Sequence, residues 1–467
     1  MSLMMRSVSL ALLTCVVARP VLPVPEFKIN LDLDPEERFK EVMVHFRGVL
    51  QDLVQREASS TEVKKLYKLV ALHRGPENEE LAGEIRGMSK YGGVPLEAMQ
   101  AAQLLYELQT IMVPFENVTW PWGQTSPGTD FSFGCTGIIA RDAGDGTVTH
   151  ARNLDFSFAK WLGNMTYNGI FYKKGQELFT SQMIAGYSNP LTGIRRGGNG
   201  YTFEINTRYP PKQSNIKNLM KHLFEEKRTT SGWIKRKVLE SIDNFEDAVE
   251  ALSTKPFAST EFVIMSGTQK GVILARDPDD LYHKETLGPH KNDYILITNF
   301  DFWDHDKKEW FDPTSIHFGH SRRVGAERLL NNSVNINSDY LYQTLNDDEV
   351  IAKDTIFQML ANVEKDSYKT YLPPCEACSG CVDFGSCLQS SESCCGVRSH
   401  FTLSCGMGGG YKCGCLADGA CRAANLNTSK GDEDCCSFES HFTLACPGSL
   451  RKCGPDPSKT ASVINYV

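Results

Sequence analysis

The chain has few cysteines over most of its length. It contains 16 in all, but Cys135 is the only one between residues 20 and 374; Cys15 lies near the N-terminus, and the other fourteen lie between Cys375 and Cys453. In an oxidising compartment, a lone thiol in so long a region is either buried and inert or kept free for chemistry. The count alone leaves both interpretations open.

The sequence also lacks a basic excess and long apolar runs. Its 49 Lys and Arg residues are outnumbered by 57 Asp and Glu residues, and the net charge is −8. There is no basic stripe or basic tail, which argues against nucleic acid as a partner. Beyond the N-terminal segment, no stretch approaches the ~20 apolar residues that a transmembrane helix needs. We therefore expect the mature chain to be soluble.

Residues 1–18 are typical of a removable secretory signal. Arg6 provides the positive end, residues 8–17 form an apolar core too short to span a bilayer, and Ala18 is a small residue suited to cleavage. The mature protein is therefore expected in the lysosome or outside the cell. Glycosylation sequons fit such a protein, and they begin at Asn117, Asn164, Asn331 and Asn427.

Residues 19–134 are predicted to form a helical N-terminal region that ends in a loop. Asp34, followed by a proline and two glutamates, has the pattern of a helix start. Apolar residues then recur at helical spacing, at Phe39, Val42, Met43, Phe46, Leu50 and Leu53. Residues 113–134 are rich in Pro, Gly and Ser and are read as the loop. Trp120 and Trp122 either pack within this loop, which we prefer, or contact a membrane surface or lipid carrier.

Residues 135–374 alternate between predicted strands and helices. Strands are expected at residues 136–141, 147–156, 201–206, 262–265, 271–275 and 294–298, and helices at 232–253 and 321–330. Helices before, within and after antiparallel strands indicate an α+β layered sandwich.

Residues 375–453 form a cysteine-rich tail with two six-cysteine modules, 381–413 and 415–453, followed by a flexible C-terminus at residues 454–467. Both modules carry Ser-His-Phe-Thr-Leu before their fifth cysteine. Each is too short to stand on a hydrophobic core alone, which predicts a disulfide-rich tail. Zinc binding is the alternative for these cysteines, and the secretory signal disfavours it.

Cys135 is expected to lie beside a cationic side chain. A tight turn at residues 144–145 would pair Cys135 with Leu154 and Gly137 with Arg152 across a hairpin. Because strand side chains alternate between faces, Cys135 and Arg152 would share one face. A guanidinium beside a thiol favours the reactive thiolate. The alternative for Arg152 is an ordinary salt bridge at the end of a strand.

Asp155 has the wrong parity for the face that holds Cys135. It reaches the thiol only through a bulge or because the strand ends there, and the sequence leaves both open. The Gly134–Cys135 bond carries a second signal. A Gly-Cys-Thr step after a loop allows the thiol to attack its own preceding carbonyl. Cleavage there would leave a cysteine whose free α-amine, with a usual pKa of about 8, serves as its own general base.

The chain resembles the N-acylethanolamine acid amidase and acid ceramidase family of N-terminal-nucleophile cysteine hydrolases. The resemblance runs over about residues 25–373 and rests on three motifs, which are Cys135-Thr-Gly-Ile-Ile-Ala, His150-Ala-Arg-Asn-Leu-Asp-Phe and Thr298-Asn-Phe-Asp-Phe-Trp. It implies an αββα sandwich, no cofactor and no metal. It also implies self-cleavage before Cys135 into an α-subunit, residues 19–134, and a catalytic β-subunit, residues 135–374, which stay together as a heterodimer.

The resemblance also implies a role for each site residue. Cys135 would be both the self-cleaving residue and the nucleophile, with Arg152 and Asp155 positioning its amine and thiol. Asn299 would donate to the oxyanion. Arg322 would correspond to the family's site arginine, and Asn206 is a further candidate at a strand end. Asn299 as a turn residue and Arg322 as a surface charge are the alternatives.

Three features depart from the family pattern. Gly137 stands where the family usually has serine, a loop of about 20 residues precedes the nucleophile, and the tail from Cys381 onward is additional. The predicted activity is hydrolysis of N-acyl lipids to a fatty acid and an amine, with N-acylethanolamines slightly favoured over ceramide as substrate. Acid ceramidase as the main activity is one alternative. An inactive secreted binding protein that acts through its cysteine-rich modules is the other.

Overall fold

The computed structural model describes residues 24–57, 64, 67–68, 70, 78–104, 106–107, 134–156, 162–197, 199–208, 220–303, 320–352 and 354–372. In the tail it describes only short strands, β14 to β21, between Cys381 and Cys453. The predicted signal segment, the loop before Gly134 with its two tryptophans, and the cysteine pairing of the tail lie outside the described residues.

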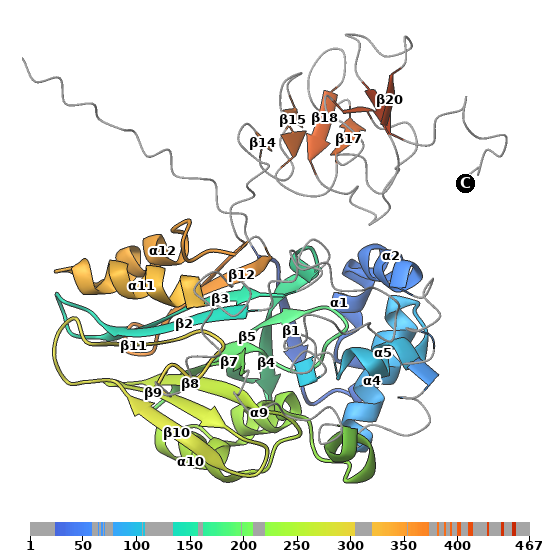
Figure 1. The fold of residues 1–467 in the computed structure, drawn as a ribbon. Helices are drawn as coiled ribbons and strands as arrows, with labels where there is room; N and C mark the ends of the chain where they lie inside the picture. The colour runs from blue at the N-terminus through green and yellow to red at the C-terminus, as the bar shows by residue number, and fades with distance from the viewer. Residues whose placement is uncertain are drawn as a thin grey trace, which may run out of the picture.

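Two β-sheets lie face to face at the centre of the molecule (Figure 1). The eight-stranded sheet has, in spatial order, β1 (Glu26–Asn30), β4 (Thr166–Lys173), β5 (Gln176–Ile184), β6 (Thr192–Arg195), β7 (Tyr201–Thr207), β8 (Glu261–Gly267), β9 (Lys270–Arg276) and β10 (Leu281–Thr286). The five-stranded sheet has β11 (Tyr294–Ile297), β2 (Gly134–Arg141), β3 (Val148–Asp155), β12 (Thr355–Asn362) and β13 (Ser367–Tyr371). Within these two sheets only β1 and β4 pair in parallel.

Helices cover the outer faces of both sheets. Helices α11 (His320–Asn332) and α12 (Ser338–Leu345) lie on the five-stranded sheet, where Leu330 and Leu341 join a buried cluster with Ile138 and Ala151. Helices α9 (Ser231–Ser241) and α10 (Phe245–Thr254) lie on the eight-stranded sheet, preceded by the short π-helix Lys221–Glu225. Burial of one apolar face per element yields four layers, α, β, β and α, which confirms the predicted α+β sandwich.

The N-terminal helices pack beside the β1–β4 edge of the sandwich (Figure 1). They are α1 (Lys40–His45), α2 (Arg47–Glu57), α4 (Glu79–Gly92) and α5 (Leu96–Ala102). Asp34 accepts a hydrogen bond from the Glu36 N–H, but it caps a single 3₁₀ turn, Pro35–Glu37, rather than the helix. The helix begins only at Lys40, and the apolar stripe from Phe39 to Leu50 is buried as predicted.

The single helix predicted over residues 232–253 is in fact two helices. Ile242 leaves the helical conformation, and the Asn244 side chain caps α10 by accepting a hydrogen bond from the Asp247 N–H. An asparagine side chain that satisfies free N–H groups competes with a continuous helix, so the break is local in origin.

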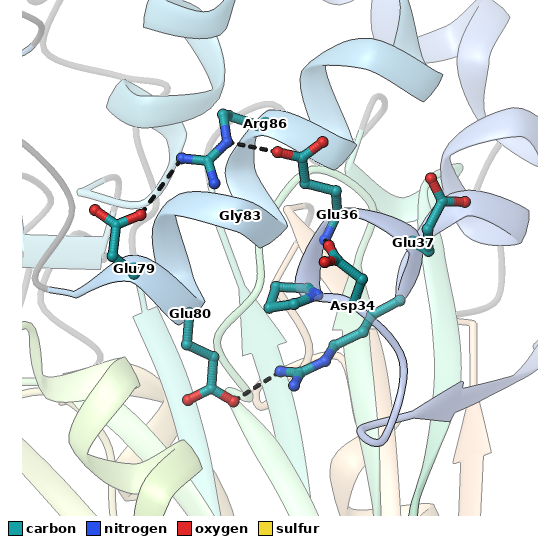
Figure 2. A pocket seen from close by; sticks show the side chains of 9 residues that line it. Asp34, Glu36, Glu37, Glu79, Glu80, Gly83 and Arg86 are labelled. Carbon is teal, nitrogen blue, oxygen red and sulfur yellow. Dashed lines mark hydrogen bonds and ion pairs between the residues drawn. The ribbon is translucent and has the colours of Figure 1, made fainter.

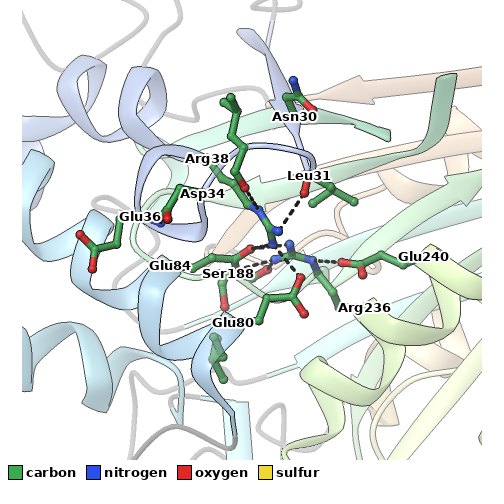
Figure 3. A network of polar contacts seen from close by, with 12 residues as sticks. Asn30, Leu31, Asp34, Glu36, Arg38, Glu80, Glu84, Ser188, Arg236 and Glu240 are labelled. Atoms are coloured by element: carbon green, nitrogen blue, oxygen red, sulfur yellow. Dashed lines mark hydrogen bonds and ion pairs between the residues drawn. The ribbon is translucent and has the colours of Figure 1, made fainter. Parts of the chain in front are cut away.

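A buried ionic cluster joins the N-terminal helices to the rest of the chain (Figure 3). Glu84 of α4 accepts hydrogen bonds from both Nη atoms of Arg236 of α9, at 2.9 and 2.7 Å, and both side chains are fully buried. Arg38 also donates to Glu84, at 2.9 Å. The part of the chain before the Gly134–Cys135 bond and the part after it are thus held together by a buried ion pair.

The space between the sheets is apolar at one end and polar at the other. Ile139 and Val148 of the smaller sheet pack against Phe262, Ile264 and Ile273 of the larger one. The polar end contains the start of β2, and the side chains described next gather there. Within the described residues, no helix is long and apolar enough to cross a membrane.

Candidate active site

Cys135 is the second residue of β2, and only 1% of its surface is exposed. The hairpin forms in the predicted register, with Cys135 opposite Leu154 and Gly137 opposite Arg152. Because Cys135 and Arg152 then share the face between the two sheets, Arg152 Nη2 lies 3.5 Å from the Cys135 Sγ. The predicted contact between thiol and guanidinium is present.

Arg152 is fixed on all sides by neighbouring strands. Its Nη2 also donates to the carbonyl of Ile205 at 2.7 Å, and its Nη1 donates to the carbonyl of Leu191 at 2.6 Å and to the Thr192 hydroxyl. The side chain is fully buried. These bonds use the fork of guanidinium donors that a lysine lacks, so the cation is held rigidly beside the sulfur.

Burial raises the pKa of the Cys135 thiol, and the charge of Arg152 opposes that rise. The carboxylates of Asp155 and Glu204 add to it. A thiol in such a setting keeps its proton in the uncut chain. Its use as a nucleophile therefore requires a base beside it, and a free α-amine on the same residue would be that base.

Asn299 and Arg322 hold the backbone of the nucleophile. The Cys135 N–H donates to Asn299 Oδ1 at 2.9 Å, and Arg322 Nη2 donates to the same oxygen at 3.0 Å. Arg322 Nη1 donates to the carbonyl of Cys135 at 2.9 Å. Arg322 is 6% exposed, so it is not the surface charge that the sequence left as an alternative. The amide nitrogen of Asn299 donates to the carbonyl of Thr207 at 2.8 Å in this uncut chain.

Asp155 reaches the nucleophile indirectly. It is the last residue of β3, and the facing strand β12 has a bulge between Thr355 and Phe357. Its Oδ2 accepts a hydrogen bond from Arg322 Nη1 at 2.9 Å, and its Oδ1 accepts one from the Thr355 hydroxyl at 2.6 Å. Of the two open alternatives, the strand end applies: β3 ends at Asp155, whereas the bulge lies on the partner strand β12. Burial raises the pKa of Asp155, and Arg322 opposes that rise.

Asn206 lies on β7, facing the smaller sheet. Its amide nitrogen donates to the carbonyl of Thr298 at 3.3 Å, next to Asn299. All six predicted site residues are thus buried around the start of β2. The structure brings them together, and their individual catalytic roles stay predictions.

Sequence reasoning missed two buried neighbours of the thiol. Tyr106, 2% exposed, comes from the N-terminal region, and its pKa is raised by burial first and then by the charge of Cys135. Glu204 lies on β7 and lies against Gly137. Glu204 could have been found, because it shares strand parity with Asn206. No local signal links Tyr106 to a strand that begins about 30 residues later in the sequence.

A surface pocket of about 700 Å³ lies elsewhere, between the 3₁₀ turn and α4 (Figure 2). Two of its carboxylates accept hydrogen bonds from arginines: Glu36 from Arg86 Nε at 2.6 Å, and Glu80 from Arg38 Nη1 at 2.7 Å. None of the six site residues lines it. Across the described residues, no group of three His, Cys, Asp or Glu side chains is arranged to bind a metal ion.

The sequence is similar to several known proteins. Residues 23–71 match the family model described as the beta subunit of N-acylethanolamine-hydrolyzing acid amidase. Acid ceramidase of Rattus norvegicus is 27% identical over 390 residues, which cover 77% of this chain and 89% of that protein. Acid ceramidase of Homo sapiens is 27% identical over 393 residues, covering 76% and 88%. The chain is thus similar to proteins of the N-acylethanolamine acid amidase and acid ceramidase family.

A solved structure, the Caenorhabditis elegans N-acylethanolamine-hydrolyzing acid amidase ortholog, is also similar. It is 26% identical with a TM-score of 0.43, and the match covers 51% of this chain and 100% of that chain. The family model is described as that of a beta subunit, but it matches the N-terminal region of this chain. That region lies in the predicted α-subunit, residues 19–134.

Proposed function

We propose that the protein is a self-cleaving amidase that hydrolyses the amide bond of N-acyl lipids to a fatty acid and an amine. The observation that carries the proposal is the environment of Cys135. Its thiol contacts Arg152, its N–H is held by Asn299, and its carbonyl is held by Arg322. The same residue therefore presents both a nucleophilic sulfur and a fixed nitrogen, and the family comparisons support this chemistry.

Self-cleavage would convert that nitrogen into the catalytic base. The Cys135 sulfur attacks the Gly134 carbonyl carbon and gives up its proton, the C–N bond breaks, and the departing nitrogen becomes a free amine. The resulting thioester joins Gly134 to the sulfur. Water then hydrolyses the thioester, which leaves a carboxylate on Gly134 and restores the thiol.

Turnover would repeat the same steps on a lipid. The α-amine of Cys135 removes the thiol proton, the sulfur attacks the acyl carbonyl, and the amine passes the proton to the departing lipid amine. Water then hydrolyses the acyl thioester to the fatty acid. Donors fixed beside Cys135 stabilise the negative oxygen of each tetrahedral intermediate, as electrostatic catalysis requires.

The test is to acidify the purified full-length precursor and sequence the N-terminus of every chain that appears. We expect a new chain beginning Cys-Thr-Gly-Ile-Ile, and none from Cys135→Ala. Activity should appear together with that chain. An active preparation that remains one continuous chain across residues 134–135 contradicts the proposal.

Two lipid classes are candidates for the substrate. The family model is that of an N-acylethanolamine-hydrolyzing amidase, whereas the similar curated proteins are acid ceramidases. The N-acylethanolamine remains our first choice and ceramide the second. Parallel assays with the two lipids at mildly acidic pH, using the processed protein, distinguish them by kcat/KM. An inactive binding protein is disfavoured, because the buried contacts around Cys135 are intact.

We also propose that the two chains stay associated after cleavage and act in the lysosome or outside the cell. The buried pair of Glu84 and Arg236 supports the first point. The N-terminal signal pattern and the cysteine-rich tail support the second. Contact with a membrane surface or lipid carrier stays part of the proposal.

A further inference from the structure

The carboxyl group of Glu204 occupies the place that a side chain at position 137 would take. A Cβ atom on Gly137 would lie 2.3 Å from Glu204 Oε1 and 2.9 Å from its Cδ. Real Cβ atoms do not approach other atoms so closely, so residue 137 and Glu204 cannot both keep a full side chain in this arrangement. Gly137 is also the position where the chain departs from the Cys-Thr-Ser pattern of the family it resembles.

Glu204 is held by a buried histidine. His150 Nε2 lies 3.0 Å from Glu204 Oε2, and His150 Nδ1 lies 2.7 Å from the Thr202 hydroxyl. The Thr202 hydroxyl in turn lies 2.6 Å from that of Ser266. Glu204 and His150 are both completely buried, yet Glu204 Oε1 has no hydrogen-bond partner. A buried carboxylate oxygen without a partner is costly, which indicates a role other than stability.

The Glu204 carboxylate lies between the two sheets, as do the side chains of Cys135 and Arg152. Gly137 pairs directly with Arg152 across the hairpin and lies on the same strand face as Cys135. Among the described residues, no carboxylate forms a direct ion pair with Arg152, and its Nε has no hydrogen-bond partner. A buried guanidinium without a nearby negative charge would be strongly destabilising.

Glu204 acts electrostatically on both members of the catalytic pair. Burial lowers the pKa of Arg152, but the charges of Cys135 and Glu204 outweigh this and raise it. Burial raises the pKa of the Cys135 thiol, and the Glu204 charge raises it further. The charged and titratable groups that face this carboxylate come from two strands: His150 and Arg152 of β3, and Cys135 of β2.

We propose that Glu204 is a positioning residue that supplies the counter-charge of Arg152, and that residue 137 is glycine in this chain in order to admit it. The inference rests on the proposed amidase function and adds a residue to that site. Glu204 balances the charge of the guanidinium and keeps it in place beside the sulfur. It also keeps the thiol protonated until the α-amine of Cys135 removes the proton.

The first test is the pH dependence of Cys135 alkylation by iodoacetamide, followed by mass spectrometry of the peptide that contains Cys135. Glu204→Gln removes a negative charge beside the thiol, so its alkylation profile should move to lower pH than that of the wild type. Glu285→Gln makes the same chemical change on the edge strand β10, where Glu285 Oε2 is also unpartnered, and should leave the profile in place. An unchanged profile in Glu204→Gln overturns the proposal.

The second test asks whether positions 137 and 204 act as one unit. Gly137→Ala should displace the carboxylate, shift the alkylation profile and slow lipid-amide hydrolysis roughly tenfold or more. In a Glu204→Gln background the same substitution should leave the profile in place, because the charge is already gone. Equal shifts in both backgrounds contradict the proposal. Gly137→Ala in the wild-type background also tests the proposal if Glu204→Gln does not fold.

The two proposals fail in different ways. Alkylation needs no lipid substrate, so the role of Glu204 is measured even if no lipid amide is hydrolysed. A wild-type protein that neither cuts itself nor hydrolyses a lipid amide refutes the proposed function. If the wild-type protein is an amidase but Glu204→Gln leaves the pH profile of Cys135 alkylation unchanged, only this inference is refuted.

Discussion

Gly134 and Arg322 are in such close contact that the residue before the nucleophile cannot carry a side chain. A Cβ atom on Gly134 would lie 1.9 Å from Arg322 Nη2 and 2.9 Å from Asn299 Oδ1. The guanidinium that holds the Cys135 carbonyl therefore lies directly against the bond proposed to be cut. Glycine at this position is therefore required by the site.

Gly134→Ala should block maturation. The added methyl group displaces Arg322, which also pairs with Asp155, so the carbonyl and N–H of Cys135 lose their fixed partners. We expect the rate of self-cleavage to fall roughly a hundredfold, measured by gel electrophoresis of the acidified precursor. Gly163→Ala is the matched control, because its Cβ would have only an ordinary contact, 3.7 Å from the Ile356 carbonyl oxygen. Normal cleavage of Gly134→Ala would show that Arg322 is dispensable.

Asn299→Ala should also slow cleavage and hydrolysis. The change removes the acceptor for the Cys135 N–H and for Arg322 Nη2, and it leaves the Thr207 carbonyl without its donor. Loss of one preorganised group of this kind costs roughly 100- to 1,000-fold in kcat. Asn335→Ala, on the exposed surface, should behave as the wild type. Single-turnover kinetics with the processed enzyme measure the effect, and a loss confined to KM would argue against an oxyanion role.

Glu84→Gln should weaken the association between the two chains that cleavage produces. It leaves Arg236 buried with only Glu240 as a charged partner, and breaking a buried pair in this way costs about 3–5 kcal/mol. Glu79→Gln, on the same helix but almost fully exposed, should cost very little. Chemical unfolding of the precursor, and size-exclusion chromatography of the cleaved protein, report the difference. Equal stability of the two variants would show that the buried pair is not what joins the chains.

The association of the two cleaved chains should persist at acidic pH. Partial burial raises the pKa of Glu80, but hydrogen bonds from Lys237 and Arg38 outweigh this and lower it to about 2, from an ordinary 4.5. A lowered carboxyl pKa means that the stabilisation is present above pH 4.5 and is lost as the pH falls towards 2. The cleaved chains should therefore coelute at pH values down to about 4 and weaken only below that. Dissociation already between pH 6 and about 5 would contradict this assignment.

The sequence located the nucleophile and its arginine because both lie on one hairpin. Hairpin register depends on a short turn and on strand alternation, which are local properties, and the predicted pairing of Gly137 with Arg152 is the one observed. Strands β1, β4, β5, β6, β10, β12 and β13 were not predicted, and β1 lies in the region that was predicted to be helical. Several of them are paired in the sheet centre or buried on both faces, so their side chains carry no clear alternation of polar and apolar residues.

What the sequence determined by itself was the hairpin, the thiol and the α+β layered class, because these follow from spacing and alternation along the chain. What only the tertiary structure decided was how Arg322, Asn299, Glu204 and Tyr106 come to surround Cys135. These residues lie apart from Cys135 in the chain, and packing of the two sheets with helix α11 and the N-terminal region brings them together. Contacts across such sequence distances depend on the whole core, and no local pattern encodes them.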